Sequence, residues 1–111
     1  RVLGIMAVSR SFGDQEMKQF VIGRPFCRSV RFELKRSAAG EETEFIILAC
    51  DGLFDVLEDQ ETVNMVRNYV MDSSIGQQER ERRKDNISQM LCTEALRRGS
   101  TDNVTVLVAW L

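Results

Sequence analysis

The sequence predicts an α+β domain, and three patterns along the chain support this class. Two almost continuous apolar runs, Phe45–Ala49 and Val104–Leu111, contain β-branched residues and favour strands buried within a sheet. Arg28–Lys35 alternates apolar and polar residues, as a half-buried antiparallel strand does. Between the two apolar runs, aliphatic residues recur at helical spacing in two segments. The 111 residues, 43% hydrophobic and 29% charged, are enough for one small globular domain.

Ahead of the first apolar run, we expect strands joined by turns. Arg1–Val8 is apolar and β-prone, which predicts a strand or a bulged strand. Ser9–Asp14 is small and polar and predicts a loop, and Gln15–Gln19 can form one helical turn. The polar, glycine-containing segment Ser37–Glu42 links Arg28–Lys35 to the first apolar run, which predicts a β-hairpin.

Two helices are expected between the apolar runs. Asp59 is a candidate N-cap, and the valine spacing over Val63–Val70 predicts a helix of about three turns. Acidic and basic residues alternate in the charged run Gln77–Asn86, which predicts a solvated helix face or loop. The apolar stripe over Ile87–Ala95 predicts a second helix, and Gly99 is placed to end it.

The strand interpretation also predicts which side chains form the core. We expect Ile47, Leu48, Val106 and Val108 to be buried, because each lies within an apolar run. Cys50, directly after the first run, is most simply a small core residue that points to the opposite face from Asp51.

Composition excludes several classes of function. A net charge of −2 gives no basis for binding nucleic acid or an anionic membrane, and no apolar run approaches the roughly 18 residues of a membrane span. Three cysteines without CxxC spacing argue against a zinc site or a disulfide framework and indicate a reducing, intracellular compartment, cytoplasmic or nuclear. The sequence has no histidine, so carboxylates are its candidate catalytic or metal-binding groups. The chain begins at Arg1 without a signal peptide, and we expect it to be a piece of a longer protein.

Two carboxylates stand at the ends of the apolar runs. Asp51 follows the first run in an Asp-Gly turn, and Gly52 leaves room for a metal or a ligand to approach the backbone. Asp102 precedes the second run, so both acids lie at one end of the sheet if the two strands are antiparallel neighbours. Their repulsion would be relieved by a cation, and oxygen ligands select Mg²⁺, Mn²⁺ or Ca²⁺. Asn103 could orient Asp102. Turn capping by the two Asp residues is the alternative, and it is the more common role for this spacing alone.

Three ordered motifs connect these residues to a known family. AVSRSFGD (Ala7–Asp14), FIILACDGLFDVL (Phe45–Leu57) and GSTDNVTVLV (Gly99–Val108) resemble motifs of the type 2C metal-dependent serine/threonine protein phosphatases. The resemblance implies an α-β-β-α sandwich of two antiparallel sheets flanked by helices, with a two-metal centre of Mg²⁺ or Mn²⁺. It implies that Asp51 and Asp102 are metal ligands, that Gly52 and Asn103 support them, and that the substrate is a phosphoprotein. Arg10 and Asp14 fall in a matching motif and are assigned to loop structure.

The chain also departs from the family pattern. The earlier motifs are absent, including an acidic one that ends in Asp-Gly-His, so residues 1–111 resemble the C-terminal portion of a single catalytic domain. No catalytic residue is expected in the chain beyond the metal ligands, and Arg24 and Arg28 are interpreted as exposed arginines. We therefore expect the parent domain to hydrolyse phosphoserine and phosphothreonine, and this fragment alone to be inactive. It would dock against its missing N-terminal portion or self-associate. The alternatives are a non-catalytic regulatory or scaffold domain of the same fold and, more weakly, a Ca²⁺-binding structural module.

Overall fold

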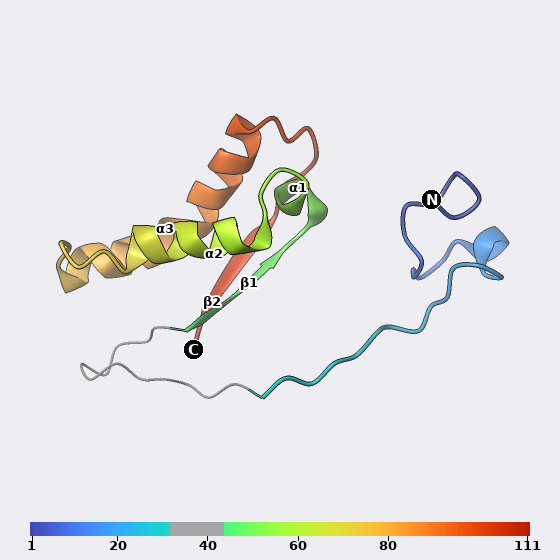
Figure 1. Ribbon diagram of the computed structural model, residues 1–111, viewed down its shortest axis with the longest axis horizontal. Helices are drawn as coiled ribbons and strands as arrows, with labels where there is room; N and C mark the ends of the chain where they lie inside the picture. Colours follow the sequence, from blue (N-terminus) through green and yellow to red (C-terminus); the bar gives the residue numbers. More distant parts are fainter. Residues whose placement is uncertain (32–43) are drawn as a thin grey trace. The chain divides into compact units, whose positions relative to one another are not determined.

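The computed structural model describes residues 1–31 and 44–111 (Figure 1). These residues fall into two compact units, which divide between Phe32 and Glu33, and each unit is described by itself. None of the helices in the described ranges is long and apolar enough to cross a membrane. The expected hairpin loop Ser37–Glu42 and the second half of the expected strand Arg28–Lys35 lie outside the described residues.

The first unit is built from turns, and the expected strand over Arg1–Val8 is wrong. Val2 and Met6 form an isolated antiparallel bridge, because Leu3 and Gly4 both adopt positive φ angles, of 50° and 74°, and reverse the chain between them. A 3-10 turn, η1, spans Gln15–Met17, close to the helical turn expected there.

The second unit contains a two-stranded antiparallel sheet. Strand β1 spans Phe45–Ala49 and β2 spans Val106–Trp110, and their register pairs Phe45 with Trp110 and Ala49 with Val106. The two apolar runs are therefore antiparallel neighbours, which is the condition under which Asp51 and Asp102 lie at one end of the sheet. Helices and an antiparallel sheet in one chain also confirm the α+β class.

Within residues 44–111, three α-helices accompany the sheet. They are α1, α2 and α3, which span Asp51–Phe54, Asp59–Val70 and Gln77–Arg97. The expected turn at Asp51 is instead the first turn of α1, and Asp59 is the first residue of α2 instead of its cap, a position that Glu58 occupies without a capping side-chain hydrogen bond. The charged run Gln77–Asn86 is the first half of α3, and Gly99 follows that helix with φ of 91°.

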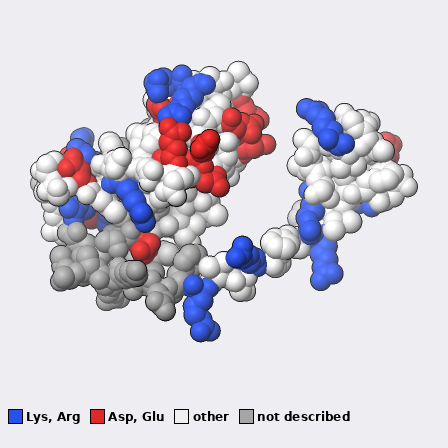
Figure 2. Space-filling model, in the orientation of Figure 1, with Lys and Arg blue, Asp and Glu red and all other residues white. Residues whose placement is uncertain are grey.

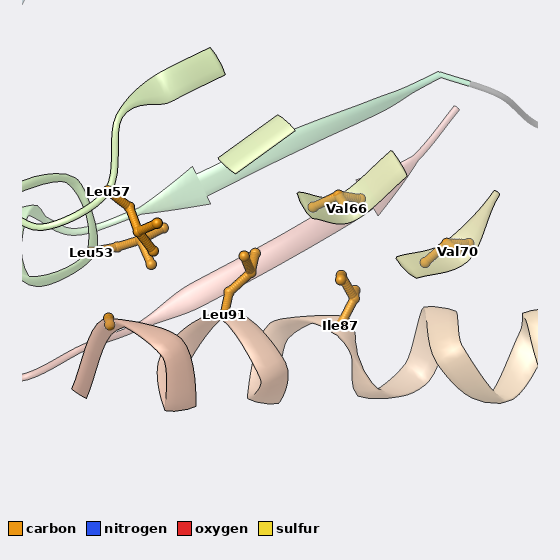
Figure 3. Close-up of a cluster of buried hydrophobic side chains, with 7 residues drawn as sticks. Leu53, Leu57, Val66, Val70, Ile87 and Leu91 are labelled. Carbon is orange, nitrogen blue, oxygen red and sulfur yellow. The ribbon is translucent and has the colours of Figure 1, made fainter. Parts of the chain in front are cut away.

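The core of the second unit lies between the helices and one face of the sheet (Figure 3). Its fully buried members come from all three helices and the turn after α1, and they are Leu53, Leu57, Val66, Val70, Ile87, Leu91 and Ala95. The inner face of the sheet consists of the alternating residues that pack against this cluster, namely Phe45, Ile47 and Ala49 of β1 and Val106, Val108 and Trp110 of β2. The period of two along each strand thus joins the sheet to the helical layer.

The opposite side of the sheet, the outer face, consists of Ile46, Leu48, Leu107 and Ala109. Leu48 pairs with Leu107 across the strands, and these two residues are 58% and 54% exposed. The prediction that Leu48 is buried is therefore wrong for the described residues. In the part of the chain that the structure describes, the helices cover only one face of the sheet, so an apolar run did not imply burial on both faces.

Candidate metal centre

Asp51 stands where β1 gives way to α1. The strand fixes its position, because the Cys50 N–H donates a hydrogen bond to the Thr105 carbonyl oxygen at 3.2 Å and so extends the pairing of β1 with β2 by one step. The Asp51 carbonyl oxygen accepts from the Asp55 N–H at 2.8 Å, which closes the single turn of α1. The Asp51 side chain is exposed. A carboxylate is thus presented to solvent from backbone that is held on both sides.

Asp102 lies in the loop between α3 and β2. Its side chain is exposed, and its Oδ1 accepts a hydrogen bond from the Asn103 N–H at 2.6 Å. This local bond orients the carboxylate and leaves Oδ2 for another partner. Asn103 therefore contacts Asp102 through its backbone N–H, which is a hydrogen bond of the kind that the sequence interpretation considered for this residue.

Three contacts hold the segment around Asp51 against the segment around Asp102. The Cys50 thiol donates to the Asn103 carbonyl oxygen at 3.1 Å and accepts from the Thr105 N–H at 3.2 Å. On the other side of Asp51, the Ser100 hydroxyl donates to the Gly52 carbonyl oxygen at 2.7 Å. Residues on both sides of Asp51 thus contact residues on both sides of Asp102, and both acids lie at the same end of the sheet.

Gly52 is required by the close approach of the two segments. A Cβ at this position would overlap the backbone carbonyl oxygen of Asn103, and a backbone atom cannot swing aside as the end of a side chain can. The sequence predicted that a metal or a ligand could approach the backbone of Gly52, whereas the close neighbour in the structure is the loop that carries Asp102.

Cys50 and Ser100 belong to this arrangement in ways that sequence reasoning missed. Cys50 is half-buried and its sulfur bridges two residues of the opposite segment, whereas a small core residue had been expected. For Ser100, the available signal was its position between the glycine that ends α3 and Asp102. A small hydroxyl residue at such a point can bond to a neighbouring backbone carbonyl group.

Acidic side chains gather over the end of the second unit that carries α1 (Figure 2). The exposed acidic residues from the start of α1 to the start of α2 are Asp51, Asp55, Glu58 and Asp59. Nearby, Arg98 donates to both carboxylate oxygens of Glu61 at 2.5 and 2.9 Å and to Glu94 at 2.8 Å. Hydrogen bonds from Arg97 and then from Arg98 lower the pKa of Glu94 to about 2. The negative charge around Asp51 favours a cation, while Arg98 neutralises the acids farther along α2 and α3.

The donor set suits a hard divalent cation. Asp51 and Asp102 offer exposed carboxylate oxygens at one end of the sheet, and oxygen is the ligand that Mg²⁺ and Mn²⁺ prefer. Within residues 1–31 and 44–111, however, no three side chains of His, Cys, Asp or Glu come together as a metal site. The described residues therefore fit part of a coordination shell.

The arginines and the acid singled out in the first unit make local contacts. Arg10 donates to the Arg24 carbonyl oxygen at 2.8 Å, and its guanidinium lies 5.9 Å from the centre of the Phe26 ring. Asp14 accepts from the Ser11 hydroxyl and has a φ of 50°. These contacts agree with the loop role expected for Arg10 and Asp14, and Arg24 and Arg28 are both exposed.

Comparison with known proteins identifies the class to which this fold and site belong. The family model described as "Protein phosphatase 2C" matches residues 1–104, almost the whole chain. The chain therefore belongs to the Protein phosphatase 2C family, which confirms the resemblance seen in its three motifs.

Individual relatives cover the same region. Protein phosphatase 2C homolog 1 of Saccharomyces cerevisiae is 36% identical over 100% of this chain and 33% of its own length. Probable protein phosphatase 2C 59 of Oryza sativa is 40% identical over 97% of this chain and 27% of its own length. PP2C-like domain-containing protein R307 of Acanthamoeba polyphaga mimivirus is 39% identical over 96% of this chain and 60% of its own length. The chain thus spans about a third or less of the first two relatives.

A solved structure supports the fold. The chain superimposes with a TM-score of 0.73 and 26% identity on a structure described as that of a C. elegans sex determining protein. The match covers 99% of this chain and 24% of that chain.

Proposed function

We propose that this chain contributes part of the active site of a metal-dependent protein serine/threonine phosphatase, with Asp51 and Asp102 as ligands of Mg²⁺ or Mn²⁺. The observation that carries the proposal is the set of contacts between the two strand ends, which hold both acids at one end of the sheet. Membership in a family described as protein phosphatases supports the reaction.

The chain's own residues have separable roles in this function. Asp51 and Asp102 would hold the cation through carboxylate oxygens. The Asn103 N–H would keep Asp102 oriented through Oδ1, and Gly52 would allow the two segments to approach. When bound, two divalent cations supply activation of water and neutralisation of phosphoryl charge in phosphomonoester hydrolysis. The substrate class is a phosphoserine or phosphothreonine protein.

We further propose that residues 1–111 are catalytically incomplete by themselves. Two carboxylates are too few to bind a hard cation tightly, because such ions take six or more oxygen ligands in all. The remaining ligands would come from elsewhere in the same domain, docked against this chain. In its absence the chain would self-associate through the outer face of the sheet.

A non-catalytic regulatory or scaffold domain of the same fold is the second candidate. The lack of a three-ligand cluster in the described part of the chain favours it. Such a domain would lack metal-dependent turnover even as the complete gene product.

The test is hydrolysis of a phosphoserine peptide by the complete gene product, with Mn²⁺ or Mg²⁺ and with EDTA. Asp51→Asn and Asp102→Asn are each expected to lower kcat/KM by about 100-fold or more, since even the loss of a residue that only orients a metal ligand costs about 10–100-fold. Both variants should stay folded, because the two carboxylates are exposed and outside the core.

Asp85→Asn is the matched control, since Asp85 is an exposed acid on α3 and the chemical change is the same. It should retain normal turnover. Near-normal activity of Asp51→Asn or Asp102→Asn would show that the residue is not a ligand. A folded wild-type protein without metal-dependent turnover would favour the non-catalytic candidate.

A further inference from the structure

We propose that Ser100 is a positioning residue for Asp102, and that its hydroxyl raises the affinity of the site for divalent cations. The inference rests on the proposed function, and it concerns a residue that binds neither metal nor substrate. Its basis is the hydrogen bond from the Ser100 hydroxyl to the Gly52 carbonyl oxygen, at 2.7 Å. This bond joins the loop of one candidate ligand to the residue directly after the other.

The Gly52 carbonyl oxygen is free to accept this bond because it receives no hydrogen bond from the Val56 N–H within the helix. Gly52 lies in α1, a helix of four residues, and the carbonyl groups at the end of a helix lack partners within it. The Val56 N–H, which would be the helical partner of Gly52, donates instead to the Leu53 carbonyl oxygen at 3.2 Å. Gly52 is also buried, so without Ser100 its carbonyl group would be left poorly satisfied.

Ser100 is itself held by the end of α3. Its N–H donates to the Ala95 carbonyl oxygen at 3.0 Å, and the Gly99 N–H donates to Leu96 at 3.0 Å, which closes the helix. Arg98, the residue before Gly99, donates hydrogen bonds to Glu61 of α2 and Glu94 of α3. Ser100 therefore extends its hydroxyl from a fixed helix end, and not from a free loop.

The loop that carries Asp102 is consequently attached at two points. Ser100 attaches it on one side, and the bonds of Cys50 with Asn103 and Thr105 attach it on the other. Without the Ser100 hydrogen bond, the loop that carries Asp102 can adopt more conformations. Cation binding must then restrict these conformations, and the entropy lost lowers the binding affinity. The expected consequence is weaker metal binding with little change in the fold.

The experiment measures Mn²⁺ binding to the complete gene product by isothermal titration calorimetry. Ser100→Ala is expected to weaken Mn²⁺ binding by about 10–100-fold, the range seen when a residue that orients a metal ligand is lost. Ser100→Thr keeps the hydroxyl and should restore affinity to near the wild-type value. In assays with a phosphoserine peptide, raising the Mn²⁺ concentration should recover most of the kcat that Ser100→Ala loses.

Thr93→Ala is the matched control. The Thr93 hydroxyl donates to the Gln89 carbonyl oxygen at 2.9 Å, on an exposed part of α3, so the variant also removes a bond from a hydroxyl to a backbone carbonyl group. It should bind Mn²⁺ as the wild type does. A purely structural role for Ser100 would change the unfolding midpoint and leave Mn²⁺ affinity unaltered.

The outcomes separate this inference from the proposed function. If the wild type binds Mn²⁺ and Ser100→Ala binds it equally well, the positioning role is overturned while the metal site stands. If the folded wild type does not bind Mn²⁺, the proposed function itself fails. Should Ser100→Ala not fold, Ser100→Cys, whose thiol is a weak donor, must bind Mn²⁺ less tightly than the wild type, and equal affinity would overturn the inference.

Discussion

The two faces of the β1–β2 sheet are both apolar but have different surroundings. On the inner face, Ile47 and Val108 pair across the strands and pack against the helical core. On the outer face, the next pair along, Leu48 and Leu107, is more than half exposed. Aliphatic side chains thus line both faces, but among the described residues the helices pack against only one of them.

The comparison shows what an apolar run does and does not specify. A continuous run predicts a strand with two apolar faces, and β1 and β2 have them. The run does not say which residues cover each face. An exposed apolar face is a surface for association, and we propose that the rest of the domain covers it.

Truncation on each face sharpens the comparison most strongly. In the complete gene product, Ile47→Ala and Leu48→Ala are each expected to lower the free energy of unfolding by about 2–5 kcal/mol. The helices pack against the inner face, and the proposed docking would bury the outer one. The denaturant midpoints of the two variants measure these losses of stability. A normal cost for Ile47→Ala with almost none for Leu48→Ala would mean that the outer face stays in solvent and that the proposed docking is wrong.

Self-association of residues 1–111 as a separate polypeptide tests the outer face directly. We expect light scattering to give a mass above that of the monomer, because Leu48 and Leu107 form an exposed apolar pair. The double substitution Leu48→Lys and Leu107→Lys should return the mass toward the monomer. Gln60→Lys, at an exposed polar position of α2, adds the same charge elsewhere and should not. A compact wild-type monomer would contradict the prediction.

The helical cover of the inner face should loosen in acid. The pKa of Glu94 falls from 4.5 to about 2 in the folded chain, chiefly through hydrogen bonds from Arg97 and then Arg98. Its contribution to stability is therefore present above pH 4.5 and is lost as the pH falls through about 2. Thermal unfolding followed from pH 5 to pH 2 should show a smaller loss for Glu94→Gln than for the wild type. An equal loss of thermal stability in the wild type and in Glu94→Gln would show that Glu94 does not account for the loss of stability in acid.

The smallest effect is expected at an exposed position in the charged half of α3. Glu81 and Lys84 form an ion pair at 3.2 Å with Glu81 largely exposed, so Glu81→Gln should change stability by no more than about 0.5 kcal/mol.

Arg83 provides the contrast within the same run. It donates to the Tyr69 carbonyl oxygen of α2 at 2.8 Å and is mostly covered. Arg83→Ala should therefore cost roughly 1–3 kcal/mol, the range for a hydrogen bond to a charged group. Urea unfolding of both variants measures the difference, and a larger cost for Glu81→Gln would contradict this view of the helix.

Much of the second unit could be predicted from local sequence. The apolar runs at Phe45–Ala49 and Val106–Trp110 form strands because β-branched and aromatic side chains suit a pleated, half-buried backbone. The spacing of Val66 and Val70 gave α2, since residues four apart share one face of a helix. Short-range steric and hydrophobic preferences are enough for such elements. In the first unit they were not, because the positive φ angles at Leu3 and Gly4 fold an apolar segment into a turn.

The candidate site divides in the same way. The sequence by itself determined that Asp51 and Asp102 flank two apolar runs, and that Gly52 accompanies the first. Only the tertiary structure decided how the two ends are joined, by the Ser100 hydroxyl on Gly52 and the Cys50 thiol on Asn103. It also decided that Leu48 is exposed while Ile47 packs beneath the helices. Contacts between residues about 50 positions apart depend on how β1, α3 and β2 pack together, and no local pattern records that packing.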